Sequence, residues 1–536
     1  MPRLGRPGGS PEVGTRSPAW PLLVLAALGG VTTGMAFPGL GWWPLAFSGV
    51  GLLVLADGHT RPRRSAVVWF TWGVALFLPH LIWAREAAGT VAWLALVVLQ
   101  AGVLALGGVV WGFARLSPLL NGRPAVRGVA FALTWVAVEQ LRSVAPFGGF
   151  PWGRLGFSQA DSPVLALASL GGVPLMSFTV ALVGYLLAAA VDAVRRKNAR
   201  SALLRAVAAV VVTGAGAIVT LPSAPQTGEL VVGVVQGDVS TPPGADRARA
   251  VLENHAAGTR ALAREGARPL DLVVWPENAT DIDPRADEEA AGTVRSSAEA
   301  VGVPLLVGAM RYGADNRYND IIVWDPERGA TAAYTKQRPA PFGEYIPLRS
   351  FVRLLSAEVD RVPLDMAAGT EPAVLRVPVQ RVGRDVITGT VICFEVAFDD
   401  VVRDAVVRGA EMLVVPTNNA SFGRTAQSTQ QLAMSRIRAV EHGRSTVQAS
   451  TVGVSAVIAP DGTVMQETGL FTAETMTAKI PLRSALTIAD RVGDAPAAAA
   501  VAVTSGLAVA GVWSTVRSRT ARTDERARPL PLSSPR

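Results

Sequence analysis

The sequence predicts a multi-span α-helical membrane domain joined to an α/β domain that lies outside the cytoplasm. Half of the 536 residues are hydrophobic and the mean hydropathy is +0.33, which is unusual for a soluble protein. Apolar segments of membrane-spanning length fill the first 220 residues and recur near the C-terminus. Between them, in residues 221–496, short apolar runs alternate with helical stretches, a pattern typical of an α/β fold with layered sheets.

The apolar segments divide the chain into five parts. Residues 1–18 are rich in Pro, Gly and Arg, and we expect them to form a disordered cytoplasmic leader. Residues 19–220 are expected to hold seven transmembrane helices, at about 19–36, 42–56, 66–84, 90–114, 124–141, 163–191 and 202–220. After the 221–496 domain, we expect an eighth transmembrane helix at 497–514 and a basic cytoplasmic tail at 515–536.

The positive charge of the chain lies outside its large polar region. Residues 221–496 hold 27 Lys and Arg against 34 Asp and Glu, whereas the remainder holds 23 against 8. This distribution indicates membrane orientation and excludes a nucleic-acid groove, so no nucleic-acid partner is expected. With the N-terminus inside, 20 basic residues fall in cytoplasmic regions and three in the opposite loops. The positive-inside rule therefore predicts cytoplasmic termini and a 221–496 domain on the outer face.

Two polar features belong to the membrane half. Glu139 and Arg142 lie near the outer end of the fifth expected span. An acid there is either a functional group or, in the simpler interpretation, part of a helix-end pair that faces neighbouring helices. The following loop, PFGGFPWGRLGFSQAD (146–161), interleaves Gly and Pro with aromatic residues. We expect an ordered outer loop that contacts lipid or the α/β domain.

The polar half is expected to alternate strands with helices. Apolar and β-branched runs predict strands at 229–236, 271–276, 303–309, 319–324, 331–335, 373–379, 385–393 and 411–416. A hairpin with Asp461-Gly462 as its turn is expected at 453–467. Amphipathic periodicity predicts helices at 245–266, 285–301, 398–409 and 426–442.

The segment RDVITGTVICFE (384–395) predicts a buried strand because most of its residues are β-branched or apolar. At its end lies Cys393, the only cysteine in the chain. A lone cysteine forms no internal disulfide, so Cys393 is either an inert small core residue or a reactive thiol. Residues at the ends of other strands favour the reactive thiol.

Polar residues follow several expected strands at the points where the apolar runs stop. Glu277 follows LVVWP, Lys336 follows TAAYT, Cys393 follows GTVI, and TNN (417–419) follows MLVVP. Such strand ends are where α/β folds place chemistry, and these supply a base, a cation, a nucleophile and amide donors. Lys336 is one of 3 lysines beside 47 arginines, which indicates either a specific need for an ammonium group or a chance surface lysine.

Other catalytic arrangements fit the sequence poorly. A Cys–His dyad would need a histidine at a strand end, but His255 and His442 fall on expected helices, and His59 and His80 lie in the membrane half. One cysteine and scattered histidines lack the spacing of metal ligands. We therefore expect neither a metal nor any other cofactor.

Three segments carry a resemblance to a known family. WPENAT (275–280), YTKQRPAPFGEYIP (334–347) and ICFE (392–395) resemble signatures of the nitrilase, or carbon–nitrogen hydrolase, superfamily. The long PFGEYIP segment, the eight expected spans and a domain inserted before the last span make the chain similar to the bacterial apolipoprotein N-acyltransferase family over about 20–514. The resemblance implies an αββα sandwich, nitrilase-like, for the extracytoplasmic domain, and a location in the bacterial cytoplasmic membrane.

The resemblance also implies roles for individual residues. Glu277 would be the general base, Lys336 the oxyanion-stabilising cation and Cys393 the nucleophile. Substrate-binding or oxyanion-supporting roles are implied for Glu344, Phe394, Glu395, Asn418 and Asn419. The sequence departs from the family pattern at two places, because Phe394 stands where a Tyr is often found and Ser421 stands at the Trp position of the related SNDAWFG pattern.

The implied reaction moves a fatty acyl chain from a membrane phospholipid to the N-terminal amine of diacylglyceryl-cysteine in an apolipoprotein, through a thioester on Cys393. The expected partners are a phospholipid acyl donor, a diacylated apolipoprotein acceptor and membrane lipid, and we expect a monomer. Residues 345–370 are interpreted as a lid, a membrane-dipping loop or a plain surface loop. Two alternative functions stay open. One is a membrane-tethered amidase with water as the acceptor, and the other is a transporter or sensor whose outer domain binds a ligand without catalysis.

Overall fold

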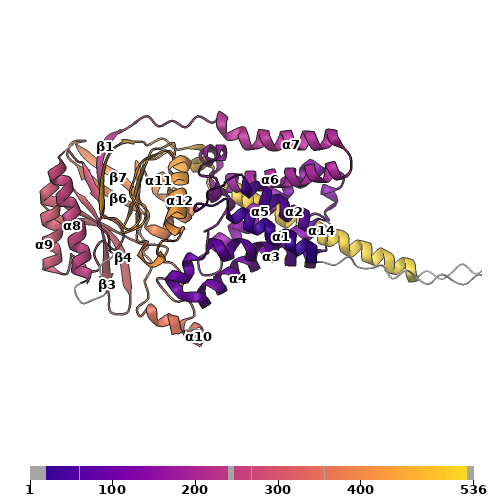
Figure 1. The fold of residues 1–536 in the computed structure, drawn as a ribbon, viewed down its shortest axis with the longest axis horizontal. Helices are drawn as coiled ribbons and strands as arrows, with labels where there is room; N and C mark the ends of the chain where they lie inside the picture. The colour runs from indigo at the N-terminus through magenta and orange to yellow at the C-terminus, as the bar shows by residue number, and fades with distance from the viewer. Residues whose placement is uncertain (1–19, 59–60, 240–246, 267–268, 355–356, 528–536) are drawn as a thin grey trace, which may run out of the picture.

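The structure is a computed structural model that describes residues 20–58, 61–239, 247–266, 269–354 and 357–527. The leader expected at 1–18 lies outside the described residues, as does the end of the expected tail from 528 onward. Figure 1 shows a helical half joined side by side to a half made of sheets and helices. The expected fold class is confirmed, with apolar helices in the N-terminal region and at the C-terminus and a two-sheet α/β unit between them.

The helical half is formed by helices that match the positions of the expected spans. They are α1 (Trp20–Gly34), α2 (Leu45–Asp57), α3 (Pro62–His80), α4 (Trp83–Ala114), α5 (Pro124–Val144), α6 (Ala168–Arg195), α7 (Ala199–Gly214) and α14 (Ala495–Ala527). Within the described ranges, four segments are long and apolar enough to cross a membrane: Trp83–Ala114, Pro163–Arg195, Ala199–Ile218 and Ala495–Ser518. Helices α1 and α2 are apolar but shorter. The number of eight spans therefore stays a prediction.

Three boundaries differ from the expected spans for local reasons. Helix α4 begins at Trp83, before the expected start at 90, because the helix continues across a kink at Gly89, whose φ is 83°. Helix α6 is kinked at Gly171 and Gly172, just before Pro174, whose ring excludes a regular helical hydrogen bond. Helix α14 runs on to Ala527, so residues 515–527 of the expected tail continue the helix.

The α/β half is a four-layer sandwich. In the described part of the chain, its strands form two six-stranded sheets, with orders β12-β1-β2-β3-β4-β5 and β11-β10-β9-β8-β7-β6. The two sheets pack face to face, α8 (Arg247–Glu265) and α9 (Glu288–Val301) cover the first, and α11 (Asp399–Val407) and α12 (Gln427–His442) cover the second. The strands are β1 (Gly228–Gln236), β2 (Leu272–Val274), β3 (Leu305–Tyr312), β4 (Arg317–Asp325), β5 (Gly329–Thr335), β6 (Val374–Val379), β7 (Arg384–Thr390), β8 (Met412–Thr417), β9 (Thr446–Ser450), β10 (Ala456–Ile458), β11 (Val464–Glu467) and β12 (Glu474–Leu482).

The central strands of each sheet are parallel and run in one direction. Strands β1, β2 and β3 are parallel neighbours in the first sheet, and β7, β8 and β9 are parallel neighbours in the second. The carboxyl ends of parallel strands meet at one edge of a sheet, where the loops that follow them come together. Residues that follow β2, β7 and β8 therefore lie at the same end of the sandwich.

The sequence analysis missed two strands and placed the end of another too late. Strand β9 (TVQAS) is fully buried but half polar, and β12 (ETMTAKIPL) mixes polar and apolar residues, so neither has a clear apolar run. Strand β7 ends at Thr390 and not at Cys393, so the expected strand at 385–393 is wrong in its last three residues. The hairpin expected at 453–467 is present as β10 and β11.

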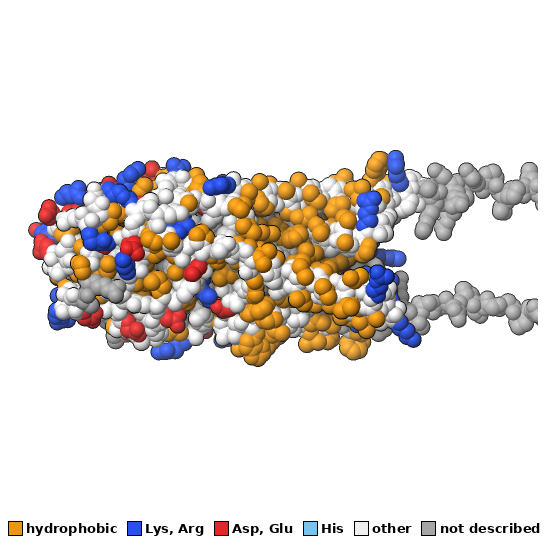
Figure 2. All heavy atoms as spheres, turned by 90° about the horizontal axis from the view of Figure 1, so that it is seen from above, with side chains coloured by type: hydrophobic (Ala, Val, Ile, Leu, Met, Phe, Trp, Pro, Cys, Tyr) orange, Lys and Arg blue, Asp and Glu red, His pale blue; other side chains and the backbone are white. Residues whose placement is uncertain are grey.

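Helix α12 joins the two halves. It packs against α6 and the short segments η2 (Leu155–Gln159) and η3 (Pro163–Leu167) on one side, and against β9 on the other. Figure 2 shows hydrophobic side chains gathered over the helical half, while charges of both signs cover the α/β half. At the far end of the helical half the visible charged side chains are basic.

Close contacts between small residues hold α1, α2 and α3 together. An ideal Cβ atom at Gly49 in α2 would lie 2.1 Å from the Thr33 hydroxyl oxygen and 2.6 Å from the Gly29 carbonyl oxygen of α1. The Gly49 carbonyl also accepts a hydrogen bond of 3.2 Å from the Trp72 indole of α3. No side chain fits at Gly49 without separating these helices.

We therefore expect Gly49→Ala to destabilise the protein by about 1–3 kcal/mol, the usual effect of overpacking. The measurement is the temperature at which detergent-solubilised protein leaves its main size-exclusion peak. The matched control is Gly102→Ala in α4, where an ideal Cβ meets nothing within 4 Å. Equal midpoints for the two variants would contradict this packing.

Candidate active site

The segment that carries Cys393 is a tight turn that follows strand β7. After the strand ends at Thr390, the chain enters a short 3₁₀ turn, η6 (Cys393–Ala397), and Cys393 itself has a φ of 53°. A left-handed conformation is uncommon for a residue with a Cβ atom and persists only where the surroundings hold it in place. The turn is buried throughout.

Glu395 holds this turn to the loop that follows strand β5. Its carboxylate accepts hydrogen bonds from the backbone N–H of Ile392 (2.6 Å), Gln337 (2.6 Å) and Arg338 (3.0 Å). It also accepts a bond of 2.9 Å from the Tyr334 hydroxyl. Burial raises the pKa of Glu395 to about 7, although these donors and the Lys336 ammonium oppose the change. Both oxygens of this buried carboxylate are thus occupied by donors of the protein, which hold the turn in place.

Lys336 lies directly after β5, between two carboxylates. Its ammonium donates to Glu277 at 2.9 Å and to Glu344 at 2.7 Å. Burial alone would lower the pKa of Lys336, but the charges of the two carboxylates outweigh it and hold that pKa well above its usual value. The side chains of Lys336 and Glu277 are 1% and 3% exposed, so this charge pair is shielded from water.

Glu277 follows β2 and is fixed by donors from two other strands. One carboxylate oxygen accepts from the Asn319 amide of β4 at 2.6 Å as well as from Lys336. The other accepts from the backbone N–H of Asn418, just after β8, at 2.8 Å. Glu344 is held in turn by the backbone N–H of Ala340 at 2.6 Å. Each carboxylate is therefore positioned before any substrate binds.

Cys393 lies beside this charged group. Its sulfur accepts a hydrogen bond of 3.2 Å from the Thr417 hydroxyl at the end of β8. Burial and the negative charge of Glu277 raise the pKa of Cys393 to about 12, while Lys336 and the Thr417 hydroxyl act to lower it. The resting thiol is therefore protonated at neutral pH, and it needs a base before it can act as a nucleophile.

The remaining predicted residues take different positions. Asn418 presents its backbone N–H to Glu277 and donates its side-chain amide to Asn278 at 3.2 Å. Asn419 is buried and donates to Gln427 at 2.6 Å and Gln431 at 2.9 Å, which indicates a structural contact with α12. The structure thus brings Glu277, Lys336, Glu344, Cys393 and Asn418 together. Their catalytic roles stay predictions.

Phe394 lies on the membrane side of the turn, in a cluster of aromatic rings. It stacks on Trp152 with centroids 6.2 Å apart and packs on Phe150 at 5.8 Å and Phe398 at 5.1 Å. Trp152 also contacts Trp83 at 5.3 Å, at the start of α4. Residues of the loop 146–161 therefore contact the residue next to the thiol, as expected for a loop that touches the α/β domain.

Sequence reasoning did not identify Asn319, Tyr334 or Gln431, which support this group. Tyr334 had a usable signal, because it lies two residues before Lys336 and so points to the same face of β5. Asn319 precedes the apolar run IIVW of β4, but Arg317, Asp320 and Asp325 in the same strand are also polar, so no clear signal in the sequence marked it. Among the residues that the structure describes, no three His, Cys, Asp or Glu side chains come close enough to hold a metal ion.

Glu139 and Arg142 are not a direct pair. Arg142 donates to Gln100 at 3.0 Å and to the Trp152 carbonyl at 2.7 Å, while Glu139 accepts from the backbone N–H of Leu155 at 2.7 Å. The interpretation as a helix-end pair is therefore wrong. Each residue instead fixes part of the loop 146–161.

Two family models match the chain. One is described as the apolipoprotein N-acyltransferase N-terminal domain and matches residues 29–186. The other is described as carbon-nitrogen hydrolase and matches residues 231–489.

Curated relatives match most of the chain. The apolipoprotein N-acyltransferase of Mycolicibacterium smegmatis is 38% identical over 519 residues, covering 90% of this chain and 83% of its own. The proteins of that name from Azotobacter vinelandii and Pseudomonas putida are each 31% identical and cover 84% and 83% of this chain, and 87% and 88% of theirs. Among solved structures, an amidase from Nesterenkonia sp. aligns with 49% of this chain and 95% of its own, at 18% identity and a TM-score of 0.37.

The raised pKa of Cys393 predicts how the rate of its alkylation depends on pH. Because its pKa is raised to about 12, alkylation by iodoacetamide should be slow at pH 8 and should accelerate about tenfold per pH unit up to about pH 11. Glu277→Gln removes a charge that raises this pKa and should speed alkylation at pH 8. Lys336→Met removes a charge that lowers the pKa and should slow it.

Mass spectrometry of the intact protein measures the fraction alkylated at Cys393, because Cys393 is the only cysteine. An alkylation profile with a midpoint near 8.5, the ordinary cysteine value, would contradict the burial and charge described here.

Proposed function

The chain belongs to the apolipoprotein N-acyltransferase family, and from that premise we propose how this membrane acyltransferase works. It transfers a fatty acyl chain from a membrane phospholipid to the N-terminal amine of diacylglyceryl-cysteine in apolipoproteins, and it acts as a monomer. The observation that carries the proposal is the buried Lys336 ammonium, held between Glu277 and Glu344 beside the single thiol of the chain.

The first half of the reaction forms a thioester. Glu277 takes the proton of Cys393, and the thiolate attacks the ester carbonyl carbon of the phospholipid. Lys336 stabilises the negative oxygen of the tetrahedral intermediate. The carbon–oxygen bond to the glycerol then breaks, Glu277 returns the proton to the leaving oxygen, and lysophospholipid departs.

The second half uses the amine of the lipoprotein as acceptor. Its neutral nitrogen attacks the thioester carbonyl, Glu277 accepts the proton released from nitrogen, and Lys336 again faces the negative oxygen. The carbon–sulfur bond breaks, the proton passes to the Cys393 thiolate, and an amide is left on the lipoprotein. Glu344 and the Asn418 backbone keep the ammonium and the base in place through both halves.

Exclusion of water favours transfer over hydrolysis of the thioester. Aromatic rings cover the membrane side of the turn, since Phe394 stacks with Phe150 and Trp152. These apolar walls suit acyl chains that arrive from the bilayer. The same argument disfavours the amidase alternative, which needs water at the thioester.

The orientation follows from the distribution of charge. Figure 2 shows basic side chains at the end of the helical half that lies away from the α/β unit. Exposed basic residues lie at or beside the α2–α3, α4–α5 and α6–α7 connections: Arg61, Arg63, Arg64, Arg123, Arg195, Arg196 and Arg200. The positive-inside rule favours this end as cytoplasmic. We propose that both termini lie in the cytoplasm of a bacterium and that the α/β unit lies on the outer face of its cytoplasmic membrane.

Labelled phospholipid and a diacylated lipopeptide, supplied to the purified protein in mixed micelles, should yield N-acylated lipopeptide. Without acceptor, the protein should gain the mass of one fatty acyl chain at Cys393, in a form that hydroxylamine removes. Cys393→Ser, Glu277→Gln and Lys336→Ala should each lose transfer by at least about 10³-fold. Free fatty acid with no acylated peptide would support the amidase, and full activity of a variant would remove that residue from its role.

Orientation is testable with single cysteines placed in the Cys393→Ala protein. Arg408→Cys on the α/β half and Arg195→Cys at the end of α6 both occupy exposed positions, with side chains 53% and 65% exposed in the native residues. In right-side-out vesicles, a membrane-impermeant maleimide should label the first, and should label the second only after detergent is added. The reverse pattern would invert the proposed topology.

A further inference from the structure

A buried arginine of α12 holds the turn that carries the thiol. The Arg438 guanidinium donates to the carbonyl oxygens of Val396 (2.8 Å) and Ala397 (3.0 Å), the last residues of that turn. It also pairs with Glu441 one helical turn further along α12, and its side chain is 0% exposed. The turn is thus fixed from the far side by charge-assisted hydrogen bonds, the stronger class of such bonds.

Asp399 connects this arginine to the membrane half. It directly follows the turn, at the start of α11, and accepts from Arg438 at 2.8 Å and from Arg154 at 2.7 Å. Arg154 belongs to the loop 146–161, and its side chain is 2% exposed. The two guanidinium groups outweigh the effect of burial and lower the pKa of Asp399 to about 2, so the carboxylate stays charged. Ion pairs and hydrogen bonds therefore connect the loop 146–161 to the turn of Cys393 through Arg154, Asp399 and Arg438.

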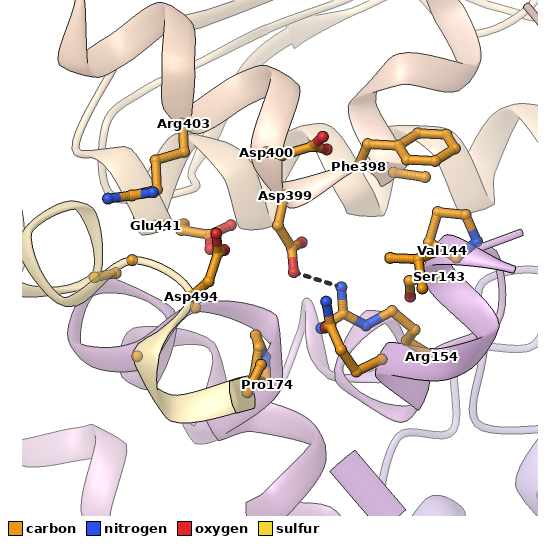
Figure 3. Close-up of a pocket in the computed structure, with 18 of the residues that line it drawn as sticks. Ser143, Val144, Arg154, Pro174, Phe398, Asp399, Asp400, Arg403, Glu441 and Asp494 are labelled. Carbon is orange, nitrogen blue, oxygen red and sulfur yellow. Dashed lines mark hydrogen bonds and ion pairs between the residues drawn. The ribbon is translucent and has the colours of Figure 1, made fainter. Parts of the chain in front are cut away.

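A cavity borders the ion pair between Arg154 and Asp399. Figure 3 shows Arg154 and Asp399 paired at the edge of a cavity of about 300 Å³ between the two halves. Pro174 of α6 and Glu441 of α12 line the same cavity. Side chains do not fill this space, so at the edge of the cavity the two halves are joined by the ion pair and not by close packing.

We propose that Arg154 is a positioning residue for acyl transfer, which acts through Asp399 and Arg438 to fix the turn of Cys393 relative to the membrane half. The inference rests on the proposed function. The lipid ester arrives from the bilayer, while the thiol is carried by the α/β unit, so the distance between them depends on the junction. A shift of about 1 Å at a reacting centre can cost about 10²-fold in rate.

Arg154→Gln is the informative variant. Asp399 keeps Arg438 as a partner, whereas replacing Arg438 would take the arginine partner from the buried Glu441. Arg154 also lies 3.7 Å from the buried Glu139, which keeps its hydrogen bonds from Trp135 and the backbone N–H of Leu155. We expect kcat for transfer to fall by about 10- to 100-fold, with KM for phospholipid in mixed micelles changed by less than about twofold. Arg154→Lys keeps the positive charge toward Asp399 and should restore most of kcat.

The matched control is Asp161→Asn. Asp161 also belongs to the loop 146–161 and pairs with Arg436 of α12 at 2.6 Å, but neither residue contacts the turn of Cys393. This variant removes an ion pair between the same loop and the α/β half, on α12 and not on α11, and should keep the wild-type kcat. Thermal midpoints of all variants, and the rate of thioester formation without acceptor, are measured alongside.

A loss of kcat and of thioester formation in Arg154→Gln, at a midpoint equal to that of Asp161→Asn and with recovery in Arg154→Lys, supports the proposal. Unchanged kcat in Arg154→Gln overturns it. An equal loss of kcat in Asp161→Asn also overturns it. So does a loss of kcat in Arg154→Gln that comes with a lowered thermal midpoint and is not recovered in Arg154→Lys. Wild-type protein that forms no thioester and transfers no acyl chain would instead refute the proposed function.

Discussion

The buried ammonium of Lys336 is the interaction on which the rest of the α/β unit depends. Removing one partner of a buried charge pair costs about 3–5 kcal/mol, because the remaining charge has lost both water and its counter-ion. Here one cation satisfies two carboxylates, Glu277 after β2 and Glu344 in the long loop after β5. The loop is therefore joined to the sandwich by the same ammonium group that positions the Glu277 carboxylate. The contacts that stabilise this end of the fold are thus the ones that hold the proposed base in place.

The two-sheet arrangement explains how such a group is assembled from distant parts of the chain. Parallel strands in each sheet direct the segments after β2, β7 and β8 to one end, where Glu277, Cys393 and Asn418 follow. Strand β5 is antiparallel to its neighbour β4, yet its last residues reach the same region and deliver Lys336. Helix α12, which covers the second sheet, then carries this end of the sandwich against the membrane helices. The fold thus brings a water-shielded charged group to the side of the α/β unit that faces the apolar helices.

Much of this was predictable from the sequence, and the exceptions have physical causes. Apolar runs identified most strands, and the strand-end residues Glu277, Lys336 and Cys393 do come together. Strand β9 was not predicted because it has no apolar run. Three of its buried side chains, those of Thr446, Gln448 and Ser450, are polar and form hydrogen bonds inside the protein. The left-handed turn at Cys393 was not predicted because VIC has high β propensity. In the structure the Glu395 carboxylate accepts from the backbone N–H of Ile392, three residues earlier, and closes a turn there.

The contacts between the halves were the hardest to foresee. Nothing in the order of residues links Arg154 to Asp399, 245 positions away, or Trp152 to Phe394. The loop 146–161 was recognisable as ordered from its Gly, Pro and aromatic residues, but its partners depend on how α12 docks on α6. Such long-range pairing is set by the whole fold and leaves no local pattern.

The protonated state of Cys393 also bears on how a single thiol resists oxidation. Peroxides and disulfides react with thiolate and much less with thiol, so a sulfur whose pKa is raised to about 12 is a poor target. In the part of the chain that is described, its side chain is buried, and with no second cysteine in the sequence there is no resolving partner for repair. Burial and a raised pKa thus protect the one thiol of the chain where no partner thiol could restore it.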